Sequence, residues 1–241
     1  MKIKLSLIIP TFKEGKIINS SVNEIIDVLK KASINFEILI VDDNSNDDTL
    51  EKISEISKIN KNVKLYLNST PKGFGNSIIE GIKKAEGELI CFVMADQSDS
   101  PYDIINYYQE ISKGNYDCIF GDRWTDSQIV QDYPKLKFYI NRIGNKFISK
   151  LFKTSYTDLT NSFKMYKKSM LMELFPFIST HFSITLEIPL KVIYRGYSYK
   201  VIPNSWKNNQ HTISNLNLIN VIKTYSLVAI YCLIERSFLK K

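Results

Sequence analysis

The sequence has few cysteines and no repeated segments, and both absences narrow the class of protein. Its three cysteines (Cys91, Cys118 and Cys232) are scattered, with no C-x-x-C spacing. An odd number of dispersed cysteines argues against a disulfide framework or a zinc site and indicates a reducing compartment. The chain also lacks internal repeats, long low-complexity tracts and an evident linker. We therefore expect one large domain within the 241 residues.

Neither apolar end of the chain is long enough to suggest a membrane-spanning helix. The run at residues 5–10 is shorter than the core of a signal peptide, and no small-residue cleavage site follows it, so we expect a buried strand. Within the apolar stretch 216–238 the longest run without charged residues is 224–234, whereas a spanning helix needs about 20 apolar residues. We expect residues 216–241 to form an amphipathic or membrane-associated helix, or a helix that joins a homodimer.

The charge of the chain is concentrated in one half. Residues 1–120 carry 14 Lys and Arg against 18 Asp and Glu, a balance of −4, and residues 121–241 carry 18 against 7, a balance of +11. A basic half suits nucleic acid, anionic lipid headgroups or a phosphorylated small molecule. No interleaved aromatic and basic motif of a known nucleic-acid-binding class occurs. We therefore expect no nucleic acid among the partners.

Short apolar runs alternate with helical patterns in the first half of the chain. The expected strands are residues 4–10, 36–43, 63–69 and 88–96, and the expected helices are 17–31, 48–58 and 76–85. Uniformly apolar strands separated by helices predict an α/β fold with a mostly parallel sheet that has helices on both faces. Such sheets bind ligands outside the carboxyl ends of their strands, so the loops that follow the strands are the first places to look for function.

The loop after the second predicted strand is strongly acidic. Residues 42–48 contain four carboxylates, a concentration that is costly unless they face solvent, cations or hydrogen-bond donors. We expect Asp42 and Asp43, at the tip of an apolar strand, to face a ligand. Asp47 and Asp48 have an equally good alternative role, which is to shape the turn and cap the helix.

The loop after the fourth predicted strand is a candidate metal site. Asp96 leaves an apolar strand, and Ser98 and Asp99 follow it. Oxygen ligands of this kind suit Mg²⁺ or Mn²⁺, which keep waters and bridge substrate phosphates. For Asp99 the alternative is an Asx turn before Pro101. The segment 72–76 (K-G-F-G-N) opens a predicted helix, where glycines and a helix N-terminus allow close approach to phosphates.

Several short motifs follow one another along the chain. They are P-T-F-K-E at 10–14, V-D-D-N-S at 41–45 with D-T at 48–49, G-F-G at 73–75 with Gly81, A-D at 95–96, G-D-R-W at 121–124, D-L-T-N-S-F-K-M-Y at 158–166, and the segment 182–196 with Glu187. This ordered set resembles family-2 glycosyltransferases of the GT-A fold, in particular the dolichyl- or polyprenyl-phosphate sugar transferases. The resemblance extends over about residues 5–215, which makes it more specific than any single motif.

The resemblance implies a GT-A domain over residues 1–215, with a Rossmann-like nucleotide-sugar half (1–120) and an acceptor half (121–215). It implies donor contacts from Pro10, Phe12, Glu14, Val41, Asp43, Lys72, Gly73, Met94, Ala95 and Asp96. The implied acceptor residues are Arg123, Asp158, Ser162 and Lys164, and the implied catalytic residues are Asp96, Arg123, Ser162 and Glu187. The metal, Mg²⁺ or Mn²⁺, is expected at Asp96 with Ser98 and Asp99.

The sequence departs from this family in two places. Met94 stands where such enzymes carry the first aspartate of an Asp-x-Asp motif, so one metal-binding carboxylate is missing. We expect weaker metal binding in the absence of nucleotide, since the site has lost negative charge. In the second place, the family's flexible cationic segment, Asn209, Thr212 and Asn215 stand where Arg, Gly and Lys are usual.

The segment 135–152 predicts a basic amphipathic helix. One helical face carries Leu136, Ile140, Ile143, Phe147 and Leu151, and five cationic residues surround it: Lys137, Arg142, Lys146, Lys150 and Lys153. A helix of this kind either lies in the headgroup region of a membrane or packs its apolar face on the core. Its place between the two motifs implied for the acceptor side gives the membrane interpretation equal weight.

These observations predict an inverting transfer of a sugar from a UDP- or GDP-sugar to a polyprenyl phosphate, by a peripheral protein at the inner face of the cell membrane. A phosphate acceptor is already anionic and needs no strong base, so positioning and charge stabilisation would carry the reaction. A second possibility is a glycan hydroxyl as the acceptor, which requires a base such as Asp122, Asp158 or Glu187. A third is a protein that binds nucleotide sugars without turnover.

Overall fold

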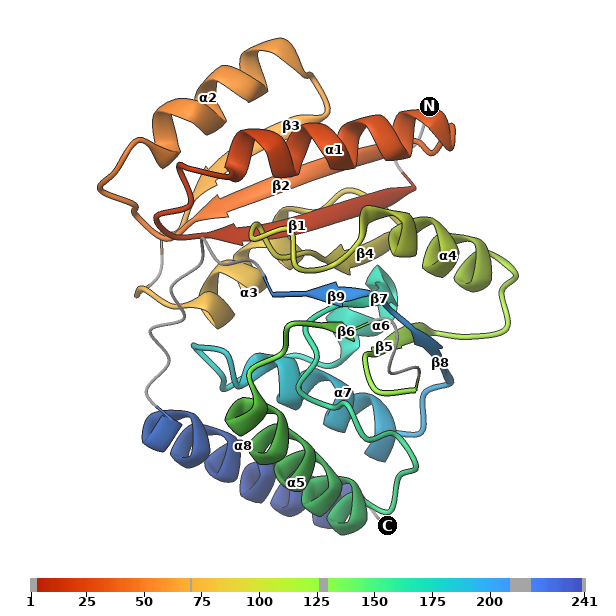
Figure 1. Ribbon diagram of the computed structural model, residues 1–241. Helices are drawn as coiled ribbons and strands as arrows, with labels where there is room; N and C mark the ends of the chain where they lie inside the picture. The colour runs from red at the N-terminus through yellow and green to blue at the C-terminus, as the bar shows by residue number, and fades with distance from the viewer. Residues whose placement is uncertain (1–3, 70, 126–129, 209–217, 240–241) are drawn as a thin grey trace.

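The computed structural model describes residues 4–69, 71–125, 130–208 and 218–239 (Figure 1). Positions 209, 212 and 215, where the cationic segment departs from the family, lie outside the described residues. The first half contains β1 (Leu5–Thr11), α1 (Ile18–Lys31), β2 (Phe36–Asp42), α2 (Thr49–Ile59), β3 (Val63–Leu67), α3 (Phe74–Lys84), β4 (Leu89–Phe92) and α4 (Pro101–Ser112).

The second half contains β5 (Cys118–Asp122), β6 (Val130–Gln131), α5 (Lys135–Phe152), β7 (Lys164–Lys167), α6 (Lys168–Glu173), α7 (Ile184–Tyr194), β8 (Tyr199–Pro203), β9 (Trp206–Lys207) and α8 (Leu218–Leu239). Helix α5 has the bounds predicted from its apolar periodicity. Strand β4 ends four residues earlier than predicted, because its pairing with β1 stops at Phe92 and the chain then turns toward Asp96.

The central sheet has seven strands in the order β3-β2-β1-β4-β7-β5-β8. All neighbouring strands are parallel except β7, which runs antiparallel to both β4 and β5. The predicted mostly parallel α/β sheet is therefore confirmed. Strand order reverses at β1, which lies between β2 and β4, and ligands of open α/β sheets bind where such a reversal opens a crevice at the carboxyl ends.

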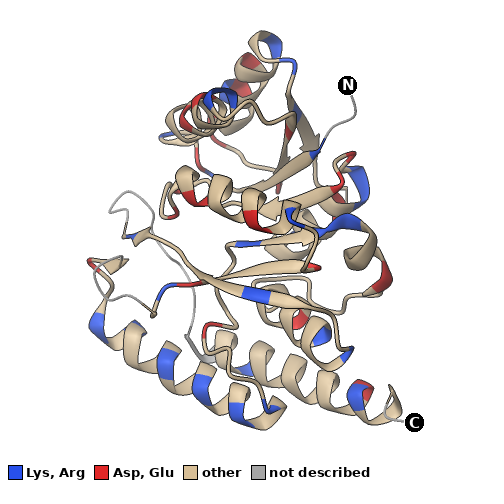
Figure 2. Cartoon of the chain, turned by 90° about the vertical axis from the view of Figure 1, so that its right-hand side faces the viewer, with Lys and Arg blue, Asp and Glu red and all other residues tan. Residues whose placement is uncertain are grey.

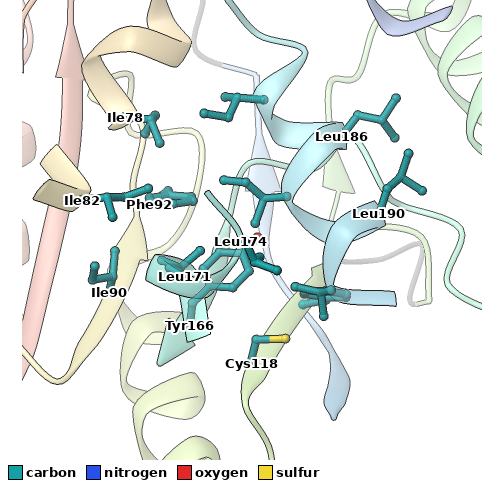
Figure 3. Close-up of a cluster of buried hydrophobic side chains, with 14 of the residues drawn as sticks. Ile78, Ile82, Ile90, Phe92, Cys118, Tyr166, Leu171, Leu174, Leu186 and Leu190 are labelled. Atoms are coloured by element: carbon teal, nitrogen blue, oxygen red, sulfur yellow. The ribbon is translucent and has the colours of Figure 1, made fainter. Parts of the chain in front are cut away.

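Side chains of β1 alternate between two hydrophobic cores, as expected of a strand buried on both faces. Leu7 and Ile9 pack with helices α1, α2 and α4, whereas Ile8 packs on the opposite side with α3 and α7. Figure 3 shows part of this second core, with Ile78 and Ile82 of α3 on one side of the cluster and Leu186 and Leu190 of α7 on the other. The predicted buried strand at the N-terminus is confirmed, and all three cysteines are free and buried.

Helices α5 and α8 lie at the end of the molecule away from α1 and α2 (Figures 1 and 2). Helix α8 packs on α7, and its Val228, Ala229 and Cys232 enter the same core as Ile148 and Phe152 of α5. Among the described residues, no helix combines the length and the apolar character required to cross a membrane.

Candidate functional site

The carboxyl ends of β1, β2 and β4 bring the predicted donor loops to one edge of the sheet. Phe12, directly after β1, is 47% exposed. The ammonium groups of Lys13 and Lys72 lie 5.3 and 5.5 Å from the centre of its ring. An exposed aromatic ring between two cations offers a stacking surface beside positive charge, which is the chemistry that a nucleotide base and its phosphates require.

Asp43 joins the end of β2 to the turn that opens α3. One of its carboxylate oxygens accepts a hydrogen bond from the backbone N–H of Gly73 at 2.9 Å, and the other accepts one from the amide of Asn68 at 2.8 Å. Gly73 has a φ of +151°, a conformation that L-residues rarely adopt. Asp43 and Gly73, both predicted donor residues, are therefore in direct contact, and Asp43 orients the turn at residues 72–76, called the donor turn below.

Asp42 does not face the crevice, which corrects the expectation from its place at a strand end. It is fully buried. Its carboxylate accepts hydrogen bonds from the Thr11 hydroxyl at 3.1 Å and from the Ser45 backbone N–H and hydroxyl, both at 2.7 Å. The serine hydroxyl in turn accepts from the backbone N–H of Lys13 at 2.9 Å. Asp42 thus ties the first two loops together from inside the protein.

Negative charge accumulates around Asp96. Its carboxylate accepts a hydrogen bond from the Ser98 backbone N–H at 2.9 Å. Partial burial, together with the charges of Asp96 and Asp47, raises the pKa of Glu14 to about 7. Burial and the charge of Asp96 also raise the pKa of Asp99 well above its usual range. Acidic groups that repel one another at the carboxyl edge of the sheet form an environment that a bound cation would stabilise.

The donor set around Asp96 fits an open divalent-metal site. Within the described part of the chain, no three acidic, histidine or cysteine side chains converge into a closed cage. Asp99 is 7% exposed and accepts a hydrogen bond from the amide of Asn204 at 3.1 Å, so it faces the protein interior. Mg²⁺ is commonly held by one or two carboxylates together with substrate phosphates and waters, and Asp96 with a diphosphate meets that requirement.

In the half predicted to bind the acceptor, Arg123 and Asp158 form a buried ion pair. Three hydrogen bonds reach the Asp158 carboxylate: from the backbone N–H of Arg123 at 3.0 Å, and from its Nε and Nη2 atoms at 2.9 and 2.7 Å. Although burial favours the neutral acid, the charge and hydrogen bonds of Arg123 hold the pKa of Asp158 below its usual value. Asp158 therefore positions the guanidinium instead of meeting an acceptor itself.

Aromatic side chains from separate parts of the chain surround this pair. The ring of Trp124 lies 5.1 Å from the rings of both Tyr133 and Phe138. The guanidinium carbons of Arg123 and Arg142 lie 5.2 and 5.4 Å from the same indole ring. Trp124 belongs to the motif G-D-R-W at 121–124, but no spacing in the sequence links it to the other aromatic residues.

Lys164 is buried and holds the acceptor segment together. Its ammonium group donates to the backbone carbonyls of Leu159, at 3.0 Å, and of Asn161, and burial lowers its pKa to about 7. The predicted direct contact with an acceptor is therefore not available to it in this structure. Ser162, which is half-buried, lines a small cavity with Phe74 of α3 and Thr185 of α7, so it lies between the donor and acceptor halves.

Glu187 also differs from its predicted catalytic role. Its side chain has no exposed area, and its oxygens accept hydrogen bonds from the backbone N–H groups of Ile178 and Ser179 at 2.9–3.2 Å. Lys191 lies 3.1 Å away as its ion-pair partner. The carboxylate is thus fully engaged inside the protein and is not presented to the crevice.

Curated relatives are glycosyltransferases that are longer than this chain. A dolichol-phosphate mannosyltransferase from Pyrococcus furiosus is 31% identical over 139 residues, which are 58% of this chain and 38% of that protein. The uncharacterized glycosyltransferase YkcC from Bacillus subtilis is 28% identical over 121 residues, or 50% of this chain and 37% of that protein. The matched part therefore spans less than two-fifths of either relative.

Solved structures share the fold over almost the whole chain. Glucosyl-3-phosphoglycerate synthase from Mycobacterium tuberculosis, crystallised with Mn²⁺, uridine diphosphate and phosphoglyceric acid, superposes with a TM-score of 0.69 at 12% identity, covering 97% of this chain and 78% of that one. A second mycobacterial protein gives a TM-score of 0.73 at 15% identity, covering 97% and 74%. The expected GT-A fold is thereby confirmed.

The family assignment rests on a match across most of the chain. A sequence model described as Glycosyl transferase family 2 matches residues 6–175. That range includes the donor loops after β1, β2 and β4 and the Arg123–Asp158 pair. The chain belongs to glycosyl transferase family 2.

Proposed function

We propose that this glycosyltransferase transfers a sugar, with inversion, from a UDP- or GDP-sugar to a polyprenyl or dolichyl phosphate at the cytoplasmic face of the cell membrane. The observation that carries the proposal is the packing of α5, an exposed apolar and basic helix, on the acceptor side. Its Phe138 contacts Trp124 at 5.1 Å, and its Asn141 amide donates to the Thr160 hydroxyl at 3.0 Å. A lipid lying along α5 would bring its phosphate close to Arg123.

The outer face of α5 supports contact with a lipid surface. Its exposed apolar residues are Leu136, Tyr139, Ile143, Phe147 and Leu151, with 39–72% of each side chain accessible. Lysines are interspersed along the same helix, as Figure 2 shows. Apolar side chains that enter the headgroup region and cations that meet anionic lipids together describe an interfacial helix.

Helix α8 extends this surface. Its exposed large apolar residues are Ile222, Leu227, Ile230, Ile234, Phe238 and Leu239, each 53–75% accessible. The Arg236 guanidinium donates to the backbone carbonyl of Phe152 at 3.5 Å, which places the ends of α8 and α5 together. The two helices lie at the same end of the molecule in both views (Figures 1 and 2), so one membrane could contact both.

Features of the donor side support the proposal that the donor is a nucleoside diphosphate sugar bound with Mg²⁺ or Mn²⁺. The mycobacterial enzyme of the same fold was crystallised with Mn²⁺ and uridine diphosphate. In this chain, Phe12 would stack on the base, and the donor turn at the N-terminus of α3 would approach the phosphates. Asp96 would hold the metal ion, whose charge stabilises the leaving diphosphate.

The state of the candidate bases favours a phosphate acceptor over a hydroxyl. A phosphate monoester is anionic near neutral pH, so the chain needs only to orient it toward the anomeric carbon. The carboxylates that a hydroxyl acceptor would need are engaged within the protein: Asp158 with Arg123, Glu187 with two backbone N–H groups, and Asp122 with the backbone N–H of Trp124 at 2.7 Å.

The test is a transfer assay with radiolabelled UDP- and GDP-sugars, Mn²⁺, and vesicles that contain polyprenyl phosphate. We expect label in the organic phase after solvent extraction, and a large loss of it in Asp96→Asn. Label that stays in a water-soluble glycan would instead indicate a hydroxyl acceptor. Nucleotide-sugar binding without transfer to any acceptor would contradict the enzymatic proposal and indicate a binding protein.

A further inference from the structure

The segment 178–182, between α6 and α7, lies directly against the donor turn. A Cβ atom on Gly73 would lie 2.2 Å from the backbone oxygen of Thr180, and one on Gly75 would lie 2.4 Å from that of Ser179. Real Cβ atoms do not approach so closely, so glycine is required at both positions for the two backbones to touch. We call residues 178–182 the backing loop.

Two further contacts join the backing loop to the donor turn. The backbone N–H of Asn76 donates to the carbonyl of Thr180 at 3.2 Å. Phe74 stacks on Phe182 with 4.3 Å between ring centres and 14° between ring planes. Because the glycine contacts leave no free space, the donor turn cannot move toward the backing loop unless that loop moves too, and the Asn76 hydrogen bond and the Phe74–Phe182 stack oppose its moving away.

Glu187 holds the backing loop at its first two residues. Its carboxylate accepts the backbone N–H groups of Ile178 and Ser179, at 3.0 and 2.9 Å. Hydrogen bonds to a charged acceptor are about twice as strong as neutral ones, and a buried site strengthens them further. The Glu187 carboxylate has no exposed area, and its hydrogen bonds to the backing loop offset the cost of burying it.

An ion network connects Glu187 to α8. Lys191, which is also without exposed area, lies 3.1 Å from Glu187 and 3.7 Å from Glu235 of α8. Arg195, directly after α7, forms a second, close ion pair with Glu235. The negative charge of Glu187 is therefore balanced by Lys191, which also contacts Glu235 of α8.

We propose that Glu187 is a positioning residue for the donor turn, and that α8 supports it through Glu235. The inference rests on the proposed donor site but makes a separate claim: the carboxylate acts through the backing loop on nucleotide binding, with no part in proton transfer. Helix α8 would then link the proposed membrane-facing surface to the donor side.

The first test measures binding of UDP and GDP, each with Mn²⁺, by calorimetry on the full chain. Glu187→Gln keeps the side-chain shape but loses the charge, and we expect about a tenfold weaker affinity, the size of a typical coupling between sites. Glu235→Gln should weaken affinity by about two- to threefold, since Arg195 and Lys191 lose one partner. The matched control is Glu173→Gln, an exposed carboxylate that bonds the Tyr197 hydroxyl and should leave affinity unchanged.

Kinetics separate positioning from acid–base chemistry. If Glu187 positions the donor turn, Glu187→Gln raises the KM for the donor while kcat and its pH profile change little. A loss of kcat of about 100-fold or more, with an unchanged donor KM and a lost pH limb, would overturn the proposal and identify a base. If Glu187→Gln does not fold, the double variant Glu187→Gln/Lys191→Met removes both buried charges, and the same donor-KM effect is expected.

Hydrogen exchange provides a readout that needs no ligand. The amides of Gly73 and Asn76, bonded to Asp43 and Thr180, should exchange faster in Glu187→Gln than in the control variant. Unchanged exchange at both amides would overturn the positioning claim. If the parent chain binds neither nucleotide, the proposed function fails, while faster exchange in the variant would still establish the coupling.

Discussion

Replacing Asp158 with asparagine should destabilise the protein strongly at neutral pH, because the change leaves the Arg123 guanidinium buried beside a neutral amide. The two side chains are 0% and 10% exposed, and three hydrogen bonds connect the two residues. Removing one partner of a buried ion pair costs about 3–5 kcal/mol. For a chain of this size, that corresponds to a Tm lowered by roughly 6–20 °C.

The pH dependence of this effect follows from the lowered pKa of Asp158 in the folded state. A carboxylate of this kind contributes stability above its unfolded pKa, near 3.9, and loses the contribution as the pH falls through the folded pKa. The difference in unfolding free energy between parent and variant should therefore be equal at pH 7 and pH 5. It should narrow only below about pH 4.

Urea unfolding at pH 7 and pH 5 measures the difference directly. The matched control is Asp117→Asn, whose carboxylate is 30% exposed and lies 3.1 Å from Lys167. Partly exposed pairs are worth about 1 kcal/mol or less. If Asp158→Asn costs no more than this control, the guanidinium of Arg123 is not held by Asp158, and the account of the acceptor side is refuted.

Four other substitutions test separate parts of the structure. Gly75→Ala should lower stability by about 2 kcal/mol and weaken nucleotide binding, because the added Cβ would meet Ser179. Gly144→Ala on α5, where an added Cβ meets nothing within 4 Å, should instead stabilise the protein by about 0.5–1 kcal/mol. Thermal unfolding of both variants tests the contrast. Glu14→Gln should raise the Tm more at pH 8 than at pH 5. The pKa of Glu14 is raised to about 7 in the folded state, so ionisation of this carboxyl lowers the stability of the parent chain as the pH rises from near 4.5 to above 7. Equal Tm shifts at the two pH values would contradict this. Phe147→Glu on α5 should weaken binding to anionic vesicles by about tenfold or more in a sedimentation assay, while leaving UDP and GDP affinity unchanged; unchanged vesicle binding would argue against α5 as a membrane contact.

The fold was largely predictable because its signals are local. Apolar strands that alternate with amphipathic helices give the first half of the sheet, and the periodicity of residues 135–152 gives α5 with its bounds. The antiparallel strand β7 was not predicted, since its pairing with β4 and β5 depends on residues far apart along the chain. No local pattern in a short apolar segment states the direction in which it will pair.

The sequence predicted which residues lie at the candidate site better than it predicted what their side chains do. Asp43 and Asp96 lie in the loops after β2 and β4, and Gly73 opens α3, as expected. Asp42 and Glu187 were misjudged because a carboxylate near a motif gives no information about the hydrogen-bond donors that will surround it. Those donors are a hydroxyl from a neighbouring strand for Asp42 and backbone N–H groups of the backing loop for Glu187, and only the folded chain brings them together.

The most direct test of the account is thermal unfolding of the chain with UDP- and GDP-sugars, with and without Mn²⁺. A ligand at 100 times its Kd stabilises the native state by about 2.7 kcal/mol, or roughly 5–11 °C in Tm for this size of protein. We predict a shift of that order for at least one nucleotide sugar, dependent on Mn²⁺ and abolished in Asp96→Asn. The absence of a shift with every nucleotide sugar tested, or an equal shift in Asp96→Asn, would contradict a metal-assisted nucleotide-sugar site at the carboxyl ends of β1, β2 and β4.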